Sequence, residues 1–285
     1  FFPKERIQAS SIRIFALWIT LPAFLLIAIA IIFLKNQTRP IINLARASEK
    51  FGRGEDVEDF NALQNRNEEI LEARGVTAFT EVAAVPHLAD GIVAVAQSNG
   101  FAGLQSNTVA FGWSEAGASG VAALLQLVRK LERLEKCTII CRNPPQEKRN
   151  GVLVVWWKGK QNNGDLMLLF AHLLTRASGW EGSRIVLRSI VGSEEEVGER
   201  RDEFTAMLEG IRINGDVEVF SKLPDVSIPE MIIQHSQDAA VVFLGLSVPG
   251  PGEEMAVAEQ LIELTDGLPG CVLVRNSGPY RGKLV

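Results

Sequence analysis

The sequence has little of the two side chains that most often bind metals. Its 285 residues include only three cysteines and three histidines. Cys137, Cys141 and Cys271 are an odd number, and each lies in or beside an apolar, strand-like run. This pattern favours reduced thiols in the cytoplasm over a disulfide framework. A zinc site needs about four Cys or His ligands at close spacing, so we expect no metal site.

Clusters of basic residues are also missing. The formal net charge is −5, with an excess of basic residues in 1–60 and of acidic residues in the remainder. Binding to a phosphate backbone needs a basic face. We therefore expect no nucleic-acid partner.

The residues do not combine into a catalytic constellation. No Ser/His/Asp or Cys/His arrangement can be assembled around His87, His172 or His235. The acidic run at 194–196 is typical of a solvated helix start, where negative charge is favourable, and not of an acid/base pair. We expect no enzyme activity and no cofactor.

Long hydrophobic runs are absent except for one. Residues 14–34 contain no charge and lie between Arg13 and Lys35. At about 1.5 Å per residue they span roughly 30 Å, the thickness of the hydrocarbon layer. We expect a flanking segment at 1–13 and one membrane-spanning helix at 14–34. Basic residues flank both ends, so the cysteines orient the chain, with residues 35–285 on the cytoplasmic side of a bacterial inner membrane.

An amphipathic helix is predicted directly after this span. Pro40 suits a first helical turn, Leu44 and Phe51 share one face, and Gly52 and Gly54 suit a helix stop. Together with the span, residues 35–60 resemble the membrane exit and first HAMP helix of bacterial osmosensor-type histidine kinases. An unrelated juxtamembrane helix is the alternative. The three histidines are followed by Leu88, Leu173 and Ser236, which excludes a phosphoacceptor box, and residues 61–75 are expected to be a linker.

From residue 76 onward, strand-like runs alternate with helical patterns, which is typical of a mostly parallel sheet covered by helices. The strands are expected at 79–85, 108–111, 138–141, 152–157, 184–191, 217–220, 240–246 and 272–274. The helices are expected at 88–98, 120–134, 165–177, 194–209, 229–234 and 253–264. A Pro-containing loop at 143–151 divides the region into halves at about 76–142 and 151–285.

Four ordered motifs carry a second resemblance, which spans nearly all of 76–285. They are Gly-Leu-Gln-Ser-Asn-Thr-Val-Ala-Phe-Gly from Gly103, Val-Val-Trp-Trp from Val154 with Gly-Asp-Leu-Met-Leu-Leu from Gly164, Trp-x-x-Ser-Arg-Ile-Val-Leu-Arg from Trp180, and the run from Leu261 to Arg275. These motifs resemble the C-terminal cytosolic domain of cation-chloride cotransporters. The resemblance implies a universal-stress-protein-like α/β domain of two related halves that forms homodimers below a transport domain and regulates ion transport. The multi-span transport domain is absent from this sequence.

Three local features are candidates for a function. The loop containing Gly245, Gly250 and Gly252 follows a strand and precedes a helix, where backbone amides can approach a phosphate. Against this, Glu253 and Glu254 place negative charge where an anion would bind. The adjacent Trp156 and Trp157 are expected to pack on opposite faces of a strand. An apolar surface for subunit contact is expected at Val121, Leu124, Leu125 and Val128.

The sequence therefore supports three hypotheses. The first is a membrane-tethered, non-enzymatic regulatory and dimerisation domain like that of cation-chloride cotransporters, with a transport domain as a further partner. The second is a HAMP-containing fragment of a signalling receptor. The third is a nucleotide-sensing module of the universal-stress type.

Overall fold

The computed structural model describes residues 56–98, 100–101, 104–142, 151–158, 163–278 and 281–282. The chain divides into two compact units, Phe1–Gln105 and Ser106–Val285, which are considered separately. The predicted membrane span and most of the HAMP-like segment lie outside the described residues. Within those residues, no helix combines the length and the apolar character needed to cross a bilayer.

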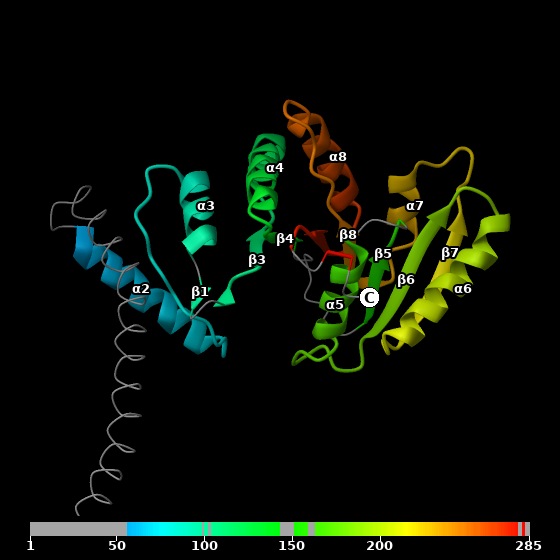
Figure 1. Cartoon of the computed structure of the whole chain (residues 1–285), viewed down its shortest axis with the longest axis horizontal. Helices are drawn as coiled ribbons and strands as arrows, with labels where there is room; N and C mark the ends of the chain where they lie inside the picture. The colour runs from blue at the N-terminus through cyan, green and yellow to red at the C-terminus, as the bar shows by residue number, and fades with distance from the viewer. Residues whose placement is uncertain are drawn as a thin grey trace, which may run out of the picture. The chain divides into compact units, whose positions relative to one another are not determined.

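The described part of the first unit contains two helices and two short paired strands (Figure 1). Helix α2 (Asp56–Ala73) includes most of the stretch expected to be a linker, and helix α3 (Leu88–Ser98) has the predicted bounds. Strands β1 (Gly100–Phe101) and β2 (Leu104–Gln105) pair antiparallel. The α2 sequence is polar along most of its length, which is why periodicity did not reveal it.

The strand predicted at 79–85 is wrong, because this segment has no regular secondary structure. Phe79 is fully exposed, and no strand among the described residues pairs with the segment. A run of apolar residues forms a strand only where a neighbour supplies the ladder of hydrogen bonds. The Thr80 hydroxyl instead bonds to the Glu68 carboxylate on α2, at 3.0 Å.

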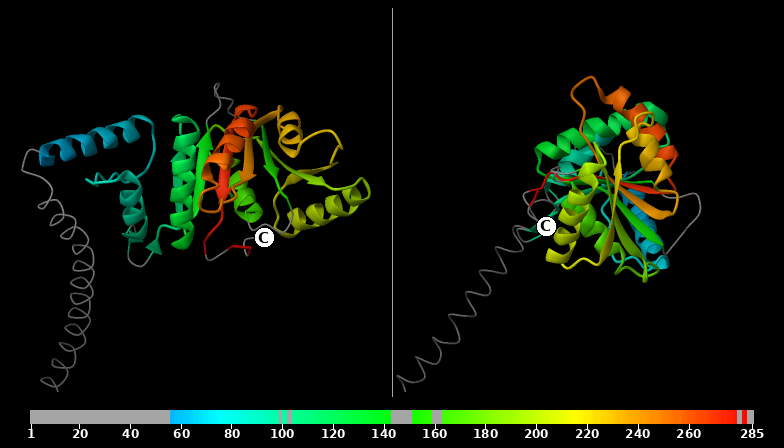
Figure 2. Two further views of the ribbon diagram at one scale, coloured as in Figure 1. Left: turned by 90° about the horizontal axis from the view of Figure 1, so that it is seen from above. Right: turned by 90° about the vertical axis from the view of Figure 1, so that its right-hand side faces the viewer.

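The second unit is built on a seven-stranded, mostly parallel sheet with helices on both faces (Figure 2). Its strands are β3 (Thr108–Gly112), β4 (Cys137–Arg142), β5 (Val152–Trp156), β6 (Arg184–Val191), β7 (Gly215–Ser221), β8 (Ala239–Gly245) and β9 (Cys271–Arg275). Its helices are α4 (Gly117–Arg133), α5 (Gly164–Leu174), α6 (Glu195–Gly210), α7 (Ile228–Gln234) and α8 (Glu254–Asp266). The mostly parallel α/β architecture expected from the sequence is confirmed.

The order of the strands is β3-β4-β9-β8-β5-β6-β7. Strands β5 to β9 are mutually parallel, whereas β4 pairs antiparallel with β9 and carries β3 beside it. The strands expected in two halves therefore lie in one sheet. Because β6 and β7 follow on one side of β5 while β8 and β9 lie on the other, the sheet is doubly wound, with its switch point between β5 and β8.

Two hydrophobic clusters hold the layers together, one on each face of the sheet. The first joins the sheet to α4 and α8, and the second joins it to α5 and α6. Val154 points into the first cluster, and its neighbours Leu153 and Val155 point into the second, as strand alternation requires. These buried faces fix the positions of the strand ends at which a site can form.

The predicted apolar contact surface on α4 is wrong. Val121, Leu125 and Val128 are buried in the first cluster, and Leu124 is half-buried against it. Helix α4 packs against both the sheet and α8, whose sequence lies more than 120 residues further along the chain. A helix covered in this way has an apolar face that is core and not surface.

Candidate functional site

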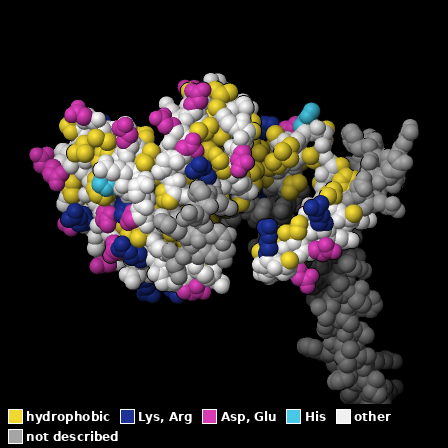
Figure 3. Space-filling view, turned by 180° about the vertical axis from the view of Figure 1, so that it is seen from behind, with side chains coloured by type: hydrophobic (Ala, Val, Ile, Leu, Met, Phe, Trp, Pro, Cys, Tyr) yellow, Lys and Arg dark blue, Asp and Glu magenta, His cyan; other side chains and the backbone are white. Residues whose placement is uncertain are grey.

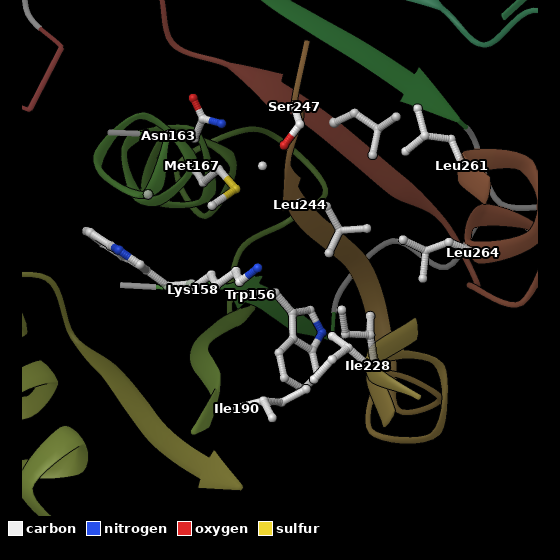
Figure 4. A pocket seen from close by; sticks show the side chains of 15 residues that line it. Trp156, Lys158, Asn163, Met167, Ile190, Ile228, Leu244, Ser247, Leu261 and Leu264 are labelled. Carbon is white, nitrogen blue, oxygen red and sulfur yellow. The ribbon is translucent and has the colours of Figure 1, made fainter. Parts of the chain in front are cut away.

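The switch point of the sheet contains a pocket. It has a volume of about 230 Å³ and opens where β5 and β8 end side by side (Figure 4). Side chains from both faces of the sheet line it, because β5 leads into α5 on one face while α7 and α8 cover the other. Doubly wound proteins generally bind ligands at this position.

Apolar side chains form most of the pocket wall. They come from seven elements and are Trp156, Met167, Ile190, Ile228, Ile232, Leu244, Leu261, Leu264 and Leu273. The buried indole of Trp156 is fixed by a hydrogen bond of 2.9 Å from its Nε1 to the Ser236 hydroxyl. Its Nε1 is therefore already satisfied, and the ring presents an apolar surface to the pocket.

Trp156 and Trp157 face opposite sides of the sheet, as predicted. Trp156 belongs to the first cluster, and Trp157 packs against the second, with its ring 5.7 Å from that of Phe204. The Trp157 ring also lies against Gly164, where a Cβ atom would come within 2.2 Å of it. Gly164 therefore allows the first turn of α5 to approach the end of β5. Both tryptophans also line the pocket.

Three polar side chains reach the pocket, from Lys158, Asn163 and Ser247. Asn163 is buried, and both ends of its amide are bonded within the fold: its Nδ2 donates to Leu246 O at 3.3 Å and its Oδ1 accepts from Asn276 N at 2.9 Å. Lys158 and Ser247 are exposed. The pocket thus combines apolar walls with one ammonium group and one hydroxyl at its edge.

The three predicted glycines lie at the same edge of the sheet, and Gly245 lines the pocket itself. A Cβ atom at Gly245 would lie 3.1 Å from Asn163 Nδ2, so glycine permits the close approach of β8 to α5. Gly250 and Gly252 lie further along the loop that leads to α8. The prediction that these glycines bind a nucleotide stays a prediction.

The loop amides that would meet a phosphate already have acceptors within the chain. Gly250 N donates to a Glu253 carboxylate oxygen at 2.9 Å, and Gly252 N donates to Glu254 at 2.7 Å. Hydrogen bonds from backbone amides, its own first, and from Arg129 lower the pKa of Glu254. The chain's own carboxylates thus occupy positions that a bound phosphate takes in a phosphate-binding loop.

Arg129 on α4 holds this loop from the other side. One of its terminal nitrogens donates to Pro249 O at 2.7 Å, to Gly250 O at 2.9 Å and to Glu254 Oε1 at 2.7 Å. Carbonyls and carboxylate therefore converge on one guanidinium. The loop is fixed in place by its own residues and by α4.

A second ion-pair network supports the α7 side of the pocket. Arg188, buried in β6, donates to Glu218 on β7 at 2.8 Å, to Asp238 before β8, and to the carbonyl of His235 at the end of α7. The His235 ring stacks on Phe220 with ring centroids 3.9 Å apart. A capping box between Ser227 and Glu230 begins α7. These contacts position Ile228 and Ile232 over the pocket.

Fold and pocket together define a doubly wound α/β protein with a largely apolar site at its switch point. No protein-family model matches the chain. Among solved structures, the chain is similar to the cytoplasmic domain of a prokaryotic cation chloride cotransporter, with a TM-score of 0.57, 17% identity, and coverage of 77% of this chain and 82% of that one. It is also similar to a universal stress protein from Archaeoglobus fulgidus, with a TM-score of 0.50, 12% identity, and coverage of 77% of each chain.

At these identities the similarity concerns the fold alone. It confirms the structural part of the resemblance found in the sequence, to the cotransporter cytoplasmic domain and to universal stress proteins. The HAMP-like resemblance rests mainly on residues outside the described ranges and stays a prediction.

Proposed function

We propose that this chain is a membrane-tethered regulatory and dimerisation domain of the kind found in cation-chloride cotransporters. The observation that carries the proposal is the agreement between the ordered motifs from Gly103 to Arg275 and the fold shared with a cotransporter cytoplasmic domain. In this account the chain is not an enzyme. A transport domain is its further partner for regulation.

The exposed apolar side chains of the first unit support self-association (Figure 3). Of the large hydrophobic side chains that are exposed among the described residues, most lie in the short stretch from Leu63 to Val95. Leu63 and Ile70, 47% and 41% exposed, are seven residues apart and so share one face of α2. Interaction sites generally expose contiguous apolar surface, so this face of α2 is the one we assign to self-association.

A pair of substitutions tests which surface carries the association. We expect Leu63→Asp together with Ile70→Asp to convert the full-length dimer to monomer, because two carboxylates would have to be desolvated in the interface. Leu173→Asp on α5 is a matched control, since Leu173 is similarly exposed in the second unit. Chemical crosslinking in lipid nanodiscs measures the outcome. If the α2 double variant and wild type crosslink equally, α2 is not the contact surface.

Membrane attachment through 14–34, with residues 35–285 in the cytoplasm, is tested by protease protection. Protease added to bacterial spheroplasts should leave residues 35–285 intact, and the same protease should digest them in inverted membrane vesicles. Digestion in intact spheroplasts would place the domain on the opposite side. Recovery of the full chain in the supernatant after membranes are pelleted would exclude tethering.

A further inference from the structure

The switch-point pocket has a composition that selects among small molecules. The pocket has a volume of about 230 Å³. Because an apolar cavity of about 150 Å³ holds one benzene molecule, this pocket admits a body of about nine non-hydrogen atoms. The pocket therefore accommodates a compact molecule with an apolar body, and a whole nucleoside triphosphate is too large for it.

The described lining of the pocket carries one positive charge and no negative charge. Lys158 is the single charged residue of its lining, which among the described residues contains no Asp or Glu. Figure 4 shows the Lys158 side chain extending toward the middle of the pocket, between Met167 and Trp156. Within the described part of the chain, no hydrogen bond or ion pair to its ammonium group is present. An ammonium group beside apolar walls favours a ligand with one anionic group.

The environment of the loop disfavours a nucleotide phosphate as the anion. A nucleotide in a doubly wound fold places its phosphates on backbone amides at a helix N-terminus. Here the amides of Gly250 and Gly252 donate to Glu253 and Glu254. A phosphate group would have to displace two carboxylates and would then lie beside them. A monoanion that binds at Lys158 avoids this repulsion, because the two glutamates do not line the pocket.

We propose that the switch-point pocket binds a small apolar monocarboxylate, with its hydrocarbon body against Trp156 and Leu244 and its carboxylate at Lys158. The exposed Ser247 hydroxyl is available as a second donor to the carboxylate. The first turn of α5 adds no further donor, because the buried Asp165 carboxylate already accepts from Leu166 N at 2.7 Å. This site is independent of the proposed dimerisation, so either proposal can fail alone.

Calorimetry on the full chain in lipid nanodiscs tests the proposal, with benzoate as the probe and its neutral isostere benzamide as the control. We expect saturable benzoate binding and benzamide binding about tenfold weaker, the difference expected for one charge-assisted hydrogen bond. Lys158→Met should reduce benzoate affinity to the level of benzamide. Lys222→Met, at the end of β7 and outside the pocket, should leave benzoate affinity unchanged.

A second variant separates binding in the pocket from charge effects at the surface. Ser247→Trp introduces a large ring at an exposed position of the lining, so the fold should survive while the pocket is filled. We expect this variant to lose benzoate and benzamide together, with an unchanged melting temperature. Equal binding of benzoate by wild type, Lys158→Met and Ser247→Trp overturns the proposal. So does the absence of benzoate binding at millimolar concentration, or saturable binding of AMP or ATP that benzoate cannot displace.

Discussion

The guanidinium of Arg188 meets the carboxylate of Asp238 through two hydrogen bonds, of 3.0 and 3.1 Å. The arginine is buried, whereas the carboxylates of Asp238 and Glu218 are each nearly half exposed. This difference in exposure determines which substitution lowers the free energy of unfolding more. Water can solvate the two carboxylates once Arg188 is removed, but it cannot reach the guanidinium once they are neutralised.

Replacing Arg188 by Met should therefore lower the free energy of unfolding by about 2 kcal/mol. Replacing both acids, as Glu218→Gln with Asp238→Asn, should cost more, about 3 to 5 kcal/mol, because it leaves a buried charge without its counter-ions. Urea denaturation of wild type, Arg188→Met and the double variant measures the order of their free energies of unfolding. A double variant more stable than Arg188→Met would contradict the account.

The pH dependence of stability should contain a contribution from Asp238. Hydrogen bonds from Arg188, the largest cause, and nearby positive charge lower the pKa of Asp238 in the folded state. Its stabilising contribution is thus fully present above the unfolded-state pKa of about 3.9 and is lost as the pH falls through the lower folded-state value. As the pH is lowered below the unfolded-state pKa, the wild type should lose stability relative to Asp238→Asn. Parallel stability curves for the two proteins at acid pH would contradict this.

The thiol of Cys271 should be inert in the folded protein. Burial is the main cause that raises the pKa of Cys271 to about 12, and burial also raises the pKa of Cys141. Because the thiolate is the reactive form, we expect Cys271 to be labelled by a disulfide reagent at pH 8 only at the rate of global unfolding. The half-buried Cys141 should react first. Mass spectrometry of peptides at timed intervals measures this, and rapid labelling of Cys271 under native conditions would show that its strand is not packed as described.

Two glycines should respond to alanine in opposite directions. Gly252 has a φ of +92°, a conformation that a residue with a Cβ atom rarely adopts. Gly252→Ala should therefore destabilise the protein by about 1 kcal/mol. Gly198 lies inside α6 with open space around its would-be Cβ, so Gly198→Ala should stabilise by about 0.5 to 1 kcal/mol. Thermal melts measure both changes. Equal effects of the same sign would show that backbone conformation does not distinguish the two positions.

The sequence predicted those elements whose own residues determine them. The strand at Arg184–Val191 and the helix at Leu88–Ser98 have the predicted bounds, because a mostly apolar run in the first and a helical period in the second are bounded by turn residues. The strand at 79–85 failed because strand formation depends on a partner elsewhere in the chain. The prediction of an exposed apolar surface on α4 was wrong for a related reason, since only the fold shows that α8 covers this face.

The pocket could not be predicted either, because it too depends on elements that are distant in the sequence. Its lining comes from β5, β6, α7, β8, β9 and the helices that follow β5 and β8, which only the strand order brings together. The sequence did indicate the edge of the sheet at which it lies, through Gly245 and the strand-to-helix loop. Lys158 carried no signal of its own, because a single lysine after a strand is common on any protein surface.

Homodimer formation is the proposal on which the proposed function depends. Sedimentation velocity of the chain in lipid nanodiscs, at tens of micromolar protein, tests it directly. We expect particles that contain two copies of the chain, with dissociation only on dilution or on substitution of the exposed apolar residues of α2. Particles with a single copy at that concentration would contradict it.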